Sequence, residues 1–259
     1  MKLIFIRHAD PDYEHDTITE KGHREAALLG QRVKNFKNVK EAYVSPLGRA
    51  KDTAGYCLKE LGMTATQYDW LQEFVVKVKS PNGEEKHIPW DYMPSYWTKD
   101  PCFYDKDHWM ESPLFEDSDI KEHYDKVTKG LDGILEKNGY KRSENLYLTD
   151  TVNAKPSLLT DPVVDDPWFL TYQVNNDAIL FFCHLGVSFV MISHLLGIAP
   201  TLLWQTFFVA PTAVTILGAE EREPGLAAFR VQTFGDTSHL LNGHEPISRA
   251  GYFTDAYQF

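Results

Sequence analysis

The chain has 259 residues, of which 43% are hydrophobic and 24% are charged, so its composition is that of a folded domain and not of a disordered segment. The formal net charge of −11, without any cluster of Lys and Arg, argues against a nucleic-acid-binding surface. Three cysteines without paired spacing predict reduced thiols and a cytoplasmic location, and no apolar run approaches the roughly 20 residues of a membrane span.

The N-terminal segment predicts a buried strand followed by a helix. Residues 3–6 form an apolar run that is typical of an interior strand of a parallel sheet. A polar loop at residues 9–17 comes next. Thr19 is then expected to cap a helix that runs to about Phe36, because apolar residues recur at helical spacing along it.

A second strand and helix follow in the same order. Residues 42–44 predict a short strand, and Ser45 followed by Pro46 predicts the start of a helix that ends at Gly62. Alternation of strands and helices is typical of a parallel sheet with right-handed crossovers.

The long segment at about 75–176 interrupts this rhythm and contains one clear helical pattern, at residues 120–137. It is too long to be a plain loop, so we interpret it as an inserted cap. Its large aromatic residues either line the functional site or form the core of the insert itself. These residues are Trp90, Tyr92, Tyr96, Trp97, Trp109 and Trp168.

The C-terminal part resumes the alternation. Residues 178–183 predict a buried strand, and residues 187–196 predict an apolar helix that ends at Gly197. Further strands are expected at residues 213–217 and 229–234. The predicted fold is a single α/β domain over residues 1–259, a three-layer sandwich in which helices flank a mostly parallel central sheet, with the inserted cap added.

Two histidines follow directly on predicted strands. Arg7 and His8 come after the first strand, and His184 comes after the strand at residues 178–183. Ligands of open α/β sheets bind at the carboxyl ends of strands, so the two ends are expected to share one site. A neutral imidazole can act as a nucleophile or as an acid or base, and the adjacent arginine favours an anionic substrate such as a phosphate.

Two more residues fit this site. Arg49 lies in the first turns of the second predicted helix, where its planar guanidinium suits phosphate oxygens. Gly186 is expected to allow a tight turn and a helix start with free amides near the anion. The alternatives are a solvated surface arginine at position 49 and a buried core histidine at position 184.

Four separated motifs carry a family resemblance. In chain order they are Ile6-Arg7-His8-Ala9, Thr17-Ile18-Thr19 with Gly22, Ser45-Pro46 with Arg49, Ala50, Thr53 and Ala54, and His184 before a glycine-containing turn. Together they resemble the histidine phosphatase superfamily, also called the phosphoglycerate-mutase-like family. Leu185 stands where the second branch has an Asp, which favours the first branch. The segment at residues 235–240 also resembles C-terminal segments of some bacterial members.

The resemblance implies a role for each matching residue. His8 would attack phosphorus and become a phosphohistidine, while Arg7, Arg49 and His184 would surround the phosphoryl oxygens. Glu73 would protonate the leaving group and then activate water. No cofactor or metal is implied, and the expected partner is a small phosphorylated metabolite.

The assignment of Glu73 depends on its surroundings. Trp70 and Phe74 are expected to raise the pKa of its carboxyl group by excluding water. A surface glutamate is the alternative, with Glu84 or Glu85 as substitutes for the catalytic role.

One departure from the family concerns Ala9, because the motif usually has Gly at this position. An alanine disfavours positive φ, so activity requires ordinary backbone geometry there. The residues that follow, Asp10 and Pro11, also differ from those common in mutases and sugar phosphatases, so the resemblance does not name a substrate.

Other functions remain open at this point. A metal-dependent hydrolase could use a cluster of imidazoles and carboxylates formed by His8, Asp10, Asp12, Glu14, His15 and Asp16. A phosphoglycerate-type mutase would use the same phosphohistidine, and a non-catalytic module would bind a phosphorylated ligand without turnover. The apolar segment at residues 202–209 is compatible with either buried core or a homodimer interface.

Overall fold

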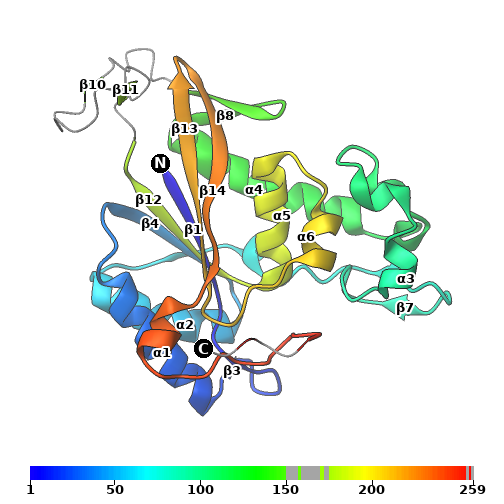
Figure 1. Cartoon of the computed structure of the whole chain (residues 1–259), viewed down its shortest axis with the longest axis horizontal. Coiled ribbons are helices and arrows are strands. Elements are labelled where there is room, and N and C mark those ends of the chain that lie inside the picture. The colour runs from blue at the N-terminus through cyan, green and yellow to red at the C-terminus, as the bar shows by residue number, and fades with distance from the viewer. Residues whose placement is uncertain (150–156, 159–169, 172–174, 255–256, 258–259) are drawn as a thin grey trace.

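The structure, a computed structural model, describes residues 1–149, 157–158, 170–171, 175–254 and 257 (Figure 1). Trp168, one of the aromatic residues expected to line the site, lies outside the described residues. No helix in the described part of the chain is long and apolar enough to cross a membrane.

An eight-stranded sheet forms the centre of the molecule. In spatial order its strands are β5 (Thr66–Gln67), β4 (Val39–Val44), β12 (Ala178–Cys183), β1 (Lys2–Arg7), β13 (Val214–Glu223), β14 (Leu226–Asp236), β9 (Leu146–Thr149) and β8 (Tyr140–Ser143). The first four pair in parallel, and β13, β14, β9 and β8 continue the sheet with antiparallel pairings. The two central strands β1 and β12 are almost entirely buried, as their apolar runs predict.

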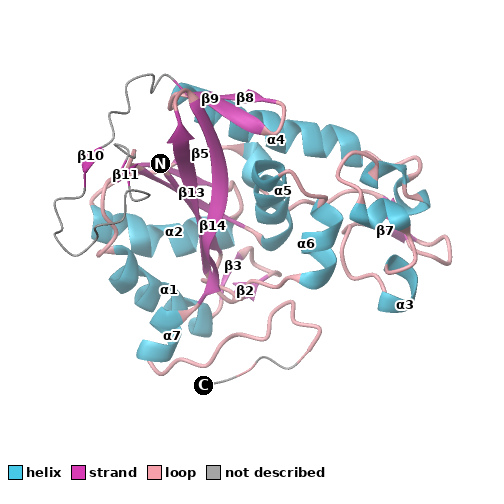
Figure 2. Ribbon diagram, turned by 45° about the horizontal axis from the view of Figure 1, so that its top comes forward, coloured by secondary structure: helices cyan, strands magenta, loops and turns pink. Residues whose placement is uncertain are grey.

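Helices cover both faces of this sheet. On one face lie α1 (Glu20–Val33), α2 (Gly48–Leu61) and α7 (Ser238–Asn242), and on the other lie α4 (Ile120–Lys137), α5 (Leu185–Leu196) and α6 (Pro200–Thr206) (Figures 1 and 2). A separate hydrophobic core lies on each side of the sheet. The predicted α/β class, with three layers, is confirmed.

Most helix ends follow from the sequence, but α1 ends at Val33 and not at about Phe36, and the start of α2 also differs. Thr19 caps α1 by accepting a hydrogen bond from the amide of Gly22 at 3.0 Å. The helix α2 begins at Gly48, and Ser45 does not cap it as predicted, because the Ser45 hydroxyl is hydrogen-bonded to His184. Gly62 ends α2 with φ of 63°.

Small strands lie in the connecting segments. The predicted polar loop after β1 contains the paired strands β2 (Pro11–Asp12) and β3 (Thr17–Ile18). A second small pair consists of β10 (Ser157–Leu158) and β11 (Leu170–Thr171). In the apolar segment at residues 202–209, Leu203, Trp204 and Val209 are buried, so much of it is core.

The segment expected to be a cap contributes to two parts of the molecule. Its first part holds short elements that gather beyond α6, on the right of Figure 1. These are β6 (Val78–Lys79), β7 (Glu85–Lys86), α3 (Pro94–Trp97) and the 3₁₀ turns Pro101–Tyr104, Trp109–Glu111 and Pro113–Phe115. The later part supplies α4, which packs on α5, and the strands β8 and β9, which join the central sheet.

The aromatic residues of this segment serve different purposes. Tyr92 and Trp109 are buried in the larger hydrophobic core, and Tyr96 and Trp97 pack against it. Trp90 also packs against this core, and in addition it lines the candidate site described below. Both interpretations of these residues therefore hold for different members of the set.

Candidate active site

His8 and His184 lie side by side at the carboxyl ends of β1 and β12. Arg7 is the register partner of Cys183 in the parallel pairing, so the residues that follow them are neighbours. The two imidazole ring centroids are 5.0 Å apart. His8 is 2% exposed and His184 is 0% exposed. The structure thus brings the two predicted histidines together.

The hydrogen bonding of His8 determines which ring nitrogen carries the proton. Its Nδ1 lies 2.8 Å from the carbonyl oxygen of Ala9, and a carbonyl oxygen can only accept a hydrogen bond. Nδ1 therefore carries the proton, and Nε2 keeps its lone pair in the neutral ring. Burial, together with the charges of Arg7 and Arg49, holds the pKa of His8 well below its usual range, so the ring is neutral near pH 7.

His184 is held by the serine at the end of β4. The Ser45 hydroxyl oxygen lies 2.7 Å from His184 Nε2 and accepts a hydrogen bond from the amide of Leu47. With that amide as its donor, the hydroxyl can give its own proton to Nε2, which places the imidazole proton on Nδ1. Burial and the nearby His8 lower the pKa of His184 well below its usual value, so its ring is also neutral.

Arg7 is fixed from the C-terminal side of the chain. Its Nη1 donates to the carbonyl oxygen of Val209 at 2.7 Å, and its Nη2 donates to that of Ala250 at 3.3 Å. The guanidinium also lies over the ring of Phe208, 5.4 Å from the centroid. These contacts fix the orientation of a buried cation directly beside His8.

Arg49 is held by a residue that the sequence did not single out for this role. Asp16 accepts hydrogen bonds from Arg49 Nη1 at 2.8 Å and from the amide of Gly48 at 2.7 Å. The guanidinium lies 5.3 Å from the ring centroid of Tyr13. The loop after β1 therefore fixes the arginine at the start of α2.

Three donors of this cluster have no partner in the protein. Among the described side chains, the buried nitrogens Arg7 Nε, Arg49 Nε and His184 Nδ1 make no hydrogen bond. Both arginines act electrostatically on both histidines, so the three groups belong to one site. Buried polar groups without partners are unusual in native proteins, and three nitrogen donors together fit an anionic ligand.

Glu73 lies within the same site and is anchored at one oxygen. Its Oε1 accepts hydrogen bonds from the amides of Phe74 at 2.8 Å and Val187 at 3.2 Å. Burial raises the pKa of the carboxyl group, although the two amides and Arg7 oppose the shift. Glu84 and Glu85, the predicted substitutes, are exposed, and Glu85 forms an ion pair with Lys77 at 2.7 Å.

Trp90 and Gly186 complete the surroundings of Glu73. A Cβ atom at position 186 would lie 2.2 Å from Trp90 Cζ3 and 2.8 Å from Glu73 Oε1. Gly186 lies within the first turn of α5 without positive φ, so its role is to leave space and not, as predicted, to permit a tight turn. The prediction of free amides at this helix start also needs correction, because the Val187 amide donates a hydrogen bond to Glu73.

The expected apolar neighbours of Glu73 lie mainly elsewhere. Phe74 is buried and stacks on Trp204, with ring centroids 5.4 Å apart. Trp70 stacks on Tyr68 and lies against Gly130 of α4. Trp90 was expected only as one member of the aromatic set, and it is the tryptophan that borders the carboxyl group.

Ala9 adopts an ordinary backbone conformation, since it is not among the described residues with positive φ. Its amide donates to Thr53 Oγ1 at 2.9 Å, and its side chain is fully buried. The replacement of glycine by alanine therefore introduces no backbone strain beside His8.

A second group of residues missed by the sequence analysis holds the end of β1. The amide of Thr212 donates to the carbonyl oxygens of Arg7 and His8, at 3.1 and 3.2 Å. Its hydroxyl lies 3.0 Å from His239 Nε2, and Thr212 has φ of 60°. His239 belongs to the segment at residues 235–240, which the resemblance had already singled out.

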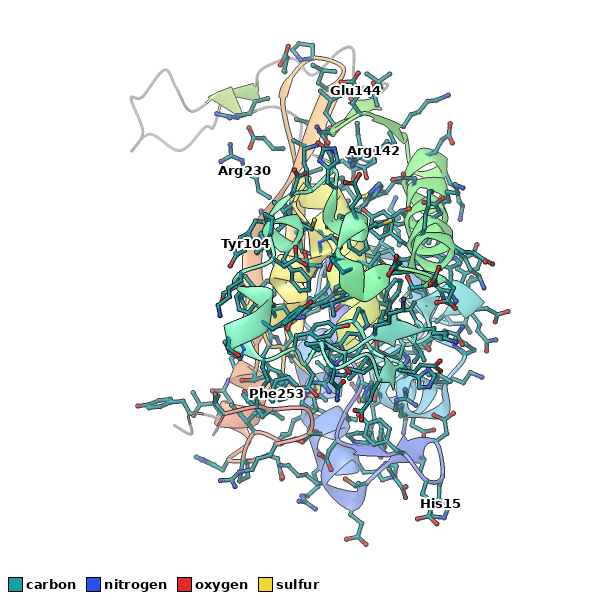
Figure 3. The ribbon with its side chains drawn as sticks, turned by 90° about the vertical axis from the view of Figure 1, so that its right-hand side faces the viewer. His15, Tyr104, Arg142, Glu144, Arg230 and Phe253 are labelled. Atoms are coloured by element: carbon teal, nitrogen blue, oxygen red, sulfur yellow. The ribbon has the colours of Figure 1, made fainter. Side chains whose placement is uncertain are left out.

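The residues of the proposed metal cluster form hydrogen bonds with different groups and do not gather around one point. Asp10 accepts hydrogen bonds from Thr19 and Ser248, and Asp12 pairs with His15 at 2.8 Å. His15 is exposed and lies at the edge of the molecule in Figure 3, whereas His8 is buried. In the part of the chain that the structure describes, no group of three or more His, Cys, Asp or Glu side chains is arranged to hold a metal ion.

Two adjoining cavities open at this site. One, of about 490 Å³, is lined by residues that include His8, Arg49, Glu73 and Trp90. The second, of about 400 Å³, is lined by sixteen residues that include Arg7 and seven aromatic residues, and it shares Glu73 and Trp90 with the first.

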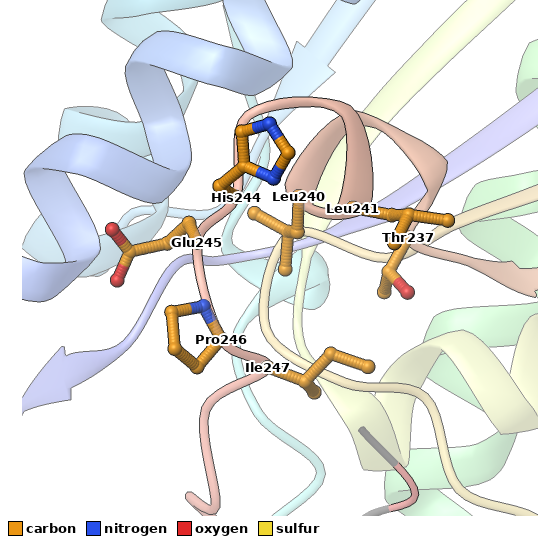
Figure 4. Close-up of a pocket in the computed structure, with 7 residues that line it drawn as sticks. All are labelled: Thr237, Leu240, Leu241, His244, Glu245, Pro246 and Ile247. Atoms are coloured by element: carbon orange, nitrogen blue, oxygen red, sulfur yellow. The ribbon is translucent and has the colours of Figure 1, made fainter. Parts of the chain in front are cut away.

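A further cavity of about 300 Å³ lies beside α7 and contains none of the candidate site residues (Figure 4). Most of its lining is apolar. The carboxylate of Glu245 at its edge is engaged with α1, where it pairs with Lys21 and Arg24 at 2.9 Å each.

Solved structures with the same fold include several phosphatases. A phosphoserine phosphatase from Entamoeba histolytica superposes with a TM-score of 0.53 at 19% identity, covering 92% of this chain and 98% of that chain. A mycobacterial glucosyl-3-phosphoglycerate phosphatase gives a TM-score of 0.52 at 13% identity, covering 90% and 98%. The α-ribazole phosphatase from Shigella flexneri gives 0.50 at 15% identity, covering 89% and 95%. No match was found among curated protein sequences.

The fold and the candidate site fit an enzyme of the phosphatase or mutase type. The family comparison makes this class specific. A model of the histidine phosphatase superfamily (branch 1) matches residues 3–141, which is more than half of the chain. The chain therefore belongs to this superfamily, in agreement with the resemblance carried by the four sequence motifs.

Proposed function

We propose that the protein hydrolyses phosphomonoesters of small molecules through a phosphohistidine on His8. In the first step, His8 Nε2 attacks phosphorus, the P–N bond forms and the P–O bond to the alcohol breaks. The leaving oxygen takes a proton from Glu73. In the second step, Glu73 removes a proton from water, the hydroxide oxygen attacks phosphorus, and inorganic phosphate leaves as the P–N bond breaks.

The observation that carries this proposal is the hydrogen bond from His8 Nδ1 to the carbonyl oxygen of Ala9, at 2.8 Å. It leaves the unprotonated Nε2 as the reactive atom, and the lowered pKa of the ring keeps that nitrogen free of a proton near neutral pH. A histidine that served only as a cation for phosphate binding would need a raised pKa.

The unpartnered donors support roles in holding the phosphoryl group. Arg7 Nε, Arg49 Nε and His184 Nδ1 are buried nitrogens that oxygens of a transferring phosphoryl group would satisfy. Because the arginines are already fixed by Val209, Ala250 and Asp16, they would need little reorganisation when the phosphoryl group binds.

The environment of Glu73 supports its role as acid and then base. Burial raises the pKa of its carboxyl group, which favours the protonated form that the first step needs. The two backbone amides bind Oε1, which leaves Oε2 to hold and deliver the proton.

The test compares the release of p-nitrophenol and inorganic phosphate from p-nitrophenyl phosphate by the wild type and by His8→Ala. His15→Ala is the matched control, because this exposed histidine lies in the loop that follows β1. We expect turnover that requires His8 and not His15, survives EDTA, and releases one phosphate per p-nitrophenol. Equal activity of the wild type and His8→Ala would refute the proposal.

The same assay separates the alternatives. Phosphate binding without turnover would indicate a non-catalytic module, and loss of activity in EDTA would indicate a metal-dependent hydrolase. Release of p-nitrophenol with less than one equivalent of phosphate, in the presence of an added alcohol, would indicate transfer to that alcohol as in a mutase.

A further inference from the structure

Seven of the sixteen residues that line the second cavity at the site are aromatic. They come from four parts of the chain that are far apart in sequence: the loop after β1, the insert, the segment after α5 and the C-terminal segment. The six aromatic residues other than Tyr13 that line it are Trp90, Trp204, Phe207, Phe208, Tyr252 and Phe253. Ligand sites that bury apolar groups are lined in this way.

Several of these aromatic rings remain accessible. Phe207 is 48% exposed and Phe253 is 69% exposed, and Figure 3 shows Phe253 on the C-terminal segment at the edge of the molecule. Tyr252 packs on Phe208, with ring centroids 3.7 Å apart, so the C-terminal segment closes one wall of the cavity. Large exposed aromatic side chains around a cavity are typical of a binding surface.

The position of Glu73 connects this cavity to the chemistry. Tyr13, Glu73, Ile88 and Trp90 line both cavities, whereas His8 and Arg49 line only the first and Arg7 lines only the second. The proposed proton donor therefore lies at the junction of the two. An ester oxygen that receives its proton there has its phosphorus on the side of His8 and its carbon chain on the side of the aromatic walls.

The charges around the two cavities limit what the second one can accept. Among the described residues that line them, Arg7 and Arg49 are the only Lys or Arg side chains. A phosphoryl dianion would neutralise both. Any further anionic group of the substrate would then face the carboxylate of Asp91, which lines the aromatic cavity, is 43% exposed and is only partly offset by Lys86 at 4.0 Å.

We propose that the substrate is the monophosphate ester of an uncharged aromatic alcohol, whose ring system occupies the aromatic cavity. This inference rests on the proposed function, because it assigns the leaving group of that reaction. The cavity volume of about 400 Å³ is sufficient for a group of one or two fused rings. Substrates with a carboxylate or a second phosphate are disfavoured by Asp91 and by the two arginines being already engaged.

The test uses aryl phosphates with closely similar leaving-group chemistry. Phenyl phosphate is compared with 2-naphthyl phosphate, which adds a ring, and with 4-carboxyphenyl phosphate, which adds a charge. We expect kcat/KM to be about tenfold higher for the naphthyl ester and about tenfold lower for the carboxyphenyl ester. Phosphoserine and 3-phosphoglyceric acid are included as small anionic substrates.

Substitutions of residues that line the aromatic cavity test whether this cavity causes the substrate preferences. Phe207→Ser and Phe253→Ser are expected to reduce the preference for the naphthyl ester at least about threefold each, mainly through KM. Tyr104→Ser is the matched control, because Tyr104 is 51% exposed and lies outside the cavity lining. Asp91→Asn is expected to raise kcat/KM for the carboxyphenyl ester, while Asp107→Asn, on the exposed surface, leaves it unchanged.

The outcomes separate the two proposals. Hydrolysis of none of the esters would refute the proposed function. Hydrolysis with equal or higher kcat/KM for carboxyphenyl phosphate or 3-phosphoglyceric acid would overturn the inference while leaving the proposed function standing. Retention of the naphthyl preference in both phenylalanine variants would also overturn it.

Discussion

We expect Gly186→Ala to impair catalysis more than stability. The added Cβ atom would lie 2.2 Å from Trp90 Cζ3 and 2.8 Å from Glu73 Oε1. Because non-bonded carbon atoms settle at about 3.5–4.0 Å, the indole ring must move by more than about 1 Å and the carboxyl group by about 0.5 Å. Trp90 borders both cavities, so it can move into open space at modest cost.

The magnitude follows from the displacement of Glu73. Catalytic groups must be held within about 0.5 Å of their productive geometry, and a displacement of about 1 Å can cost about a hundredfold in rate. We therefore expect kcat/KM to fall about ten- to hundredfold, which corresponds to about 1.4–2.7 kcal/mol in the transition state. The helix propensity of alanine, better than that of glycine by about 1 kcal/mol, offsets part of the steric cost to folding.

The assay measures kcat/KM with phenyl phosphate, whose leaving oxygen needs the proton of Glu73, and the midpoint of thermal unfolding. Gly55→Ala in α2 is the matched control, because a Cβ atom there meets nothing within 4 Å. The control should gain stability and keep wild-type activity. If Gly186→Ala also kept wild-type kcat/KM, the close approach of Trp90, Gly186 and Glu73 would have no part in catalysis.

Three further predictions concern charges around the site. The pKa of His8 is lowered, so the acid limb of the pH profile of kcat/KM should have its midpoint below the ordinary pKa of an imidazole. The pKa of Glu73 is raised, so the basic limb should have its midpoint above the ordinary pKa of a carboxyl group, and Glu73→Gln should remove this limb. Asp16→Asn weakens the charged hydrogen bond that positions Arg49, so we expect a pH-independent rise in KM of about tenfold in steady-state assays. An unchanged KM would contradict this prediction. Burial raises the pKa of Glu25 to about 7, so the folded state binds this proton more tightly than the unfolded state and loses stability as pH rises through that value. The melting temperature of Glu25→Gln should therefore fall less than that of the wild type between pH 5 and 8. Parallel plots of melting temperature against pH for the two proteins would contradict this.

Continuous apolar patterns made the central elements predictable. The strand at residues 178–183 and the helix at residues 120–137 have the predicted bounds, because burial on one or both faces imposes a clear periodicity on the sequence. The strands β13 and β14 extend beyond their predicted ends, because polar residues continue an antiparallel hairpin that is exposed toward its tip.

The contacts around the candidate site residues were less predictable. Asp16 and Thr212 lie in loops, and nothing in their local sequence shows that they would contact Arg49 or the end of β1. Ser45 has the sequence signature of a helix cap, but its hydroxyl is hydrogen-bonded to His184, which is distant in sequence. Loop residues act at sites that distant parts of the chain assemble, so their roles follow only from the three-dimensional arrangement.

The central claim is that His8 Nε2 carries the phosphoryl group during turnover. Glu73→Gln should trap this intermediate with p-nitrophenyl phosphate, because p-nitrophenolate leaves without a proton whereas hydrolysis of the P–N bond needs a base. The measurement is mass spectrometry of the peptide containing His8 after a denaturing alkaline quench, in which a phosphohistidine survives. We expect a phosphoryl group on His8 in near-stoichiometric amount. Turnover by the wild type with an unmodified His8 peptide, in both the wild type and the Glu73→Gln variant, would contradict it.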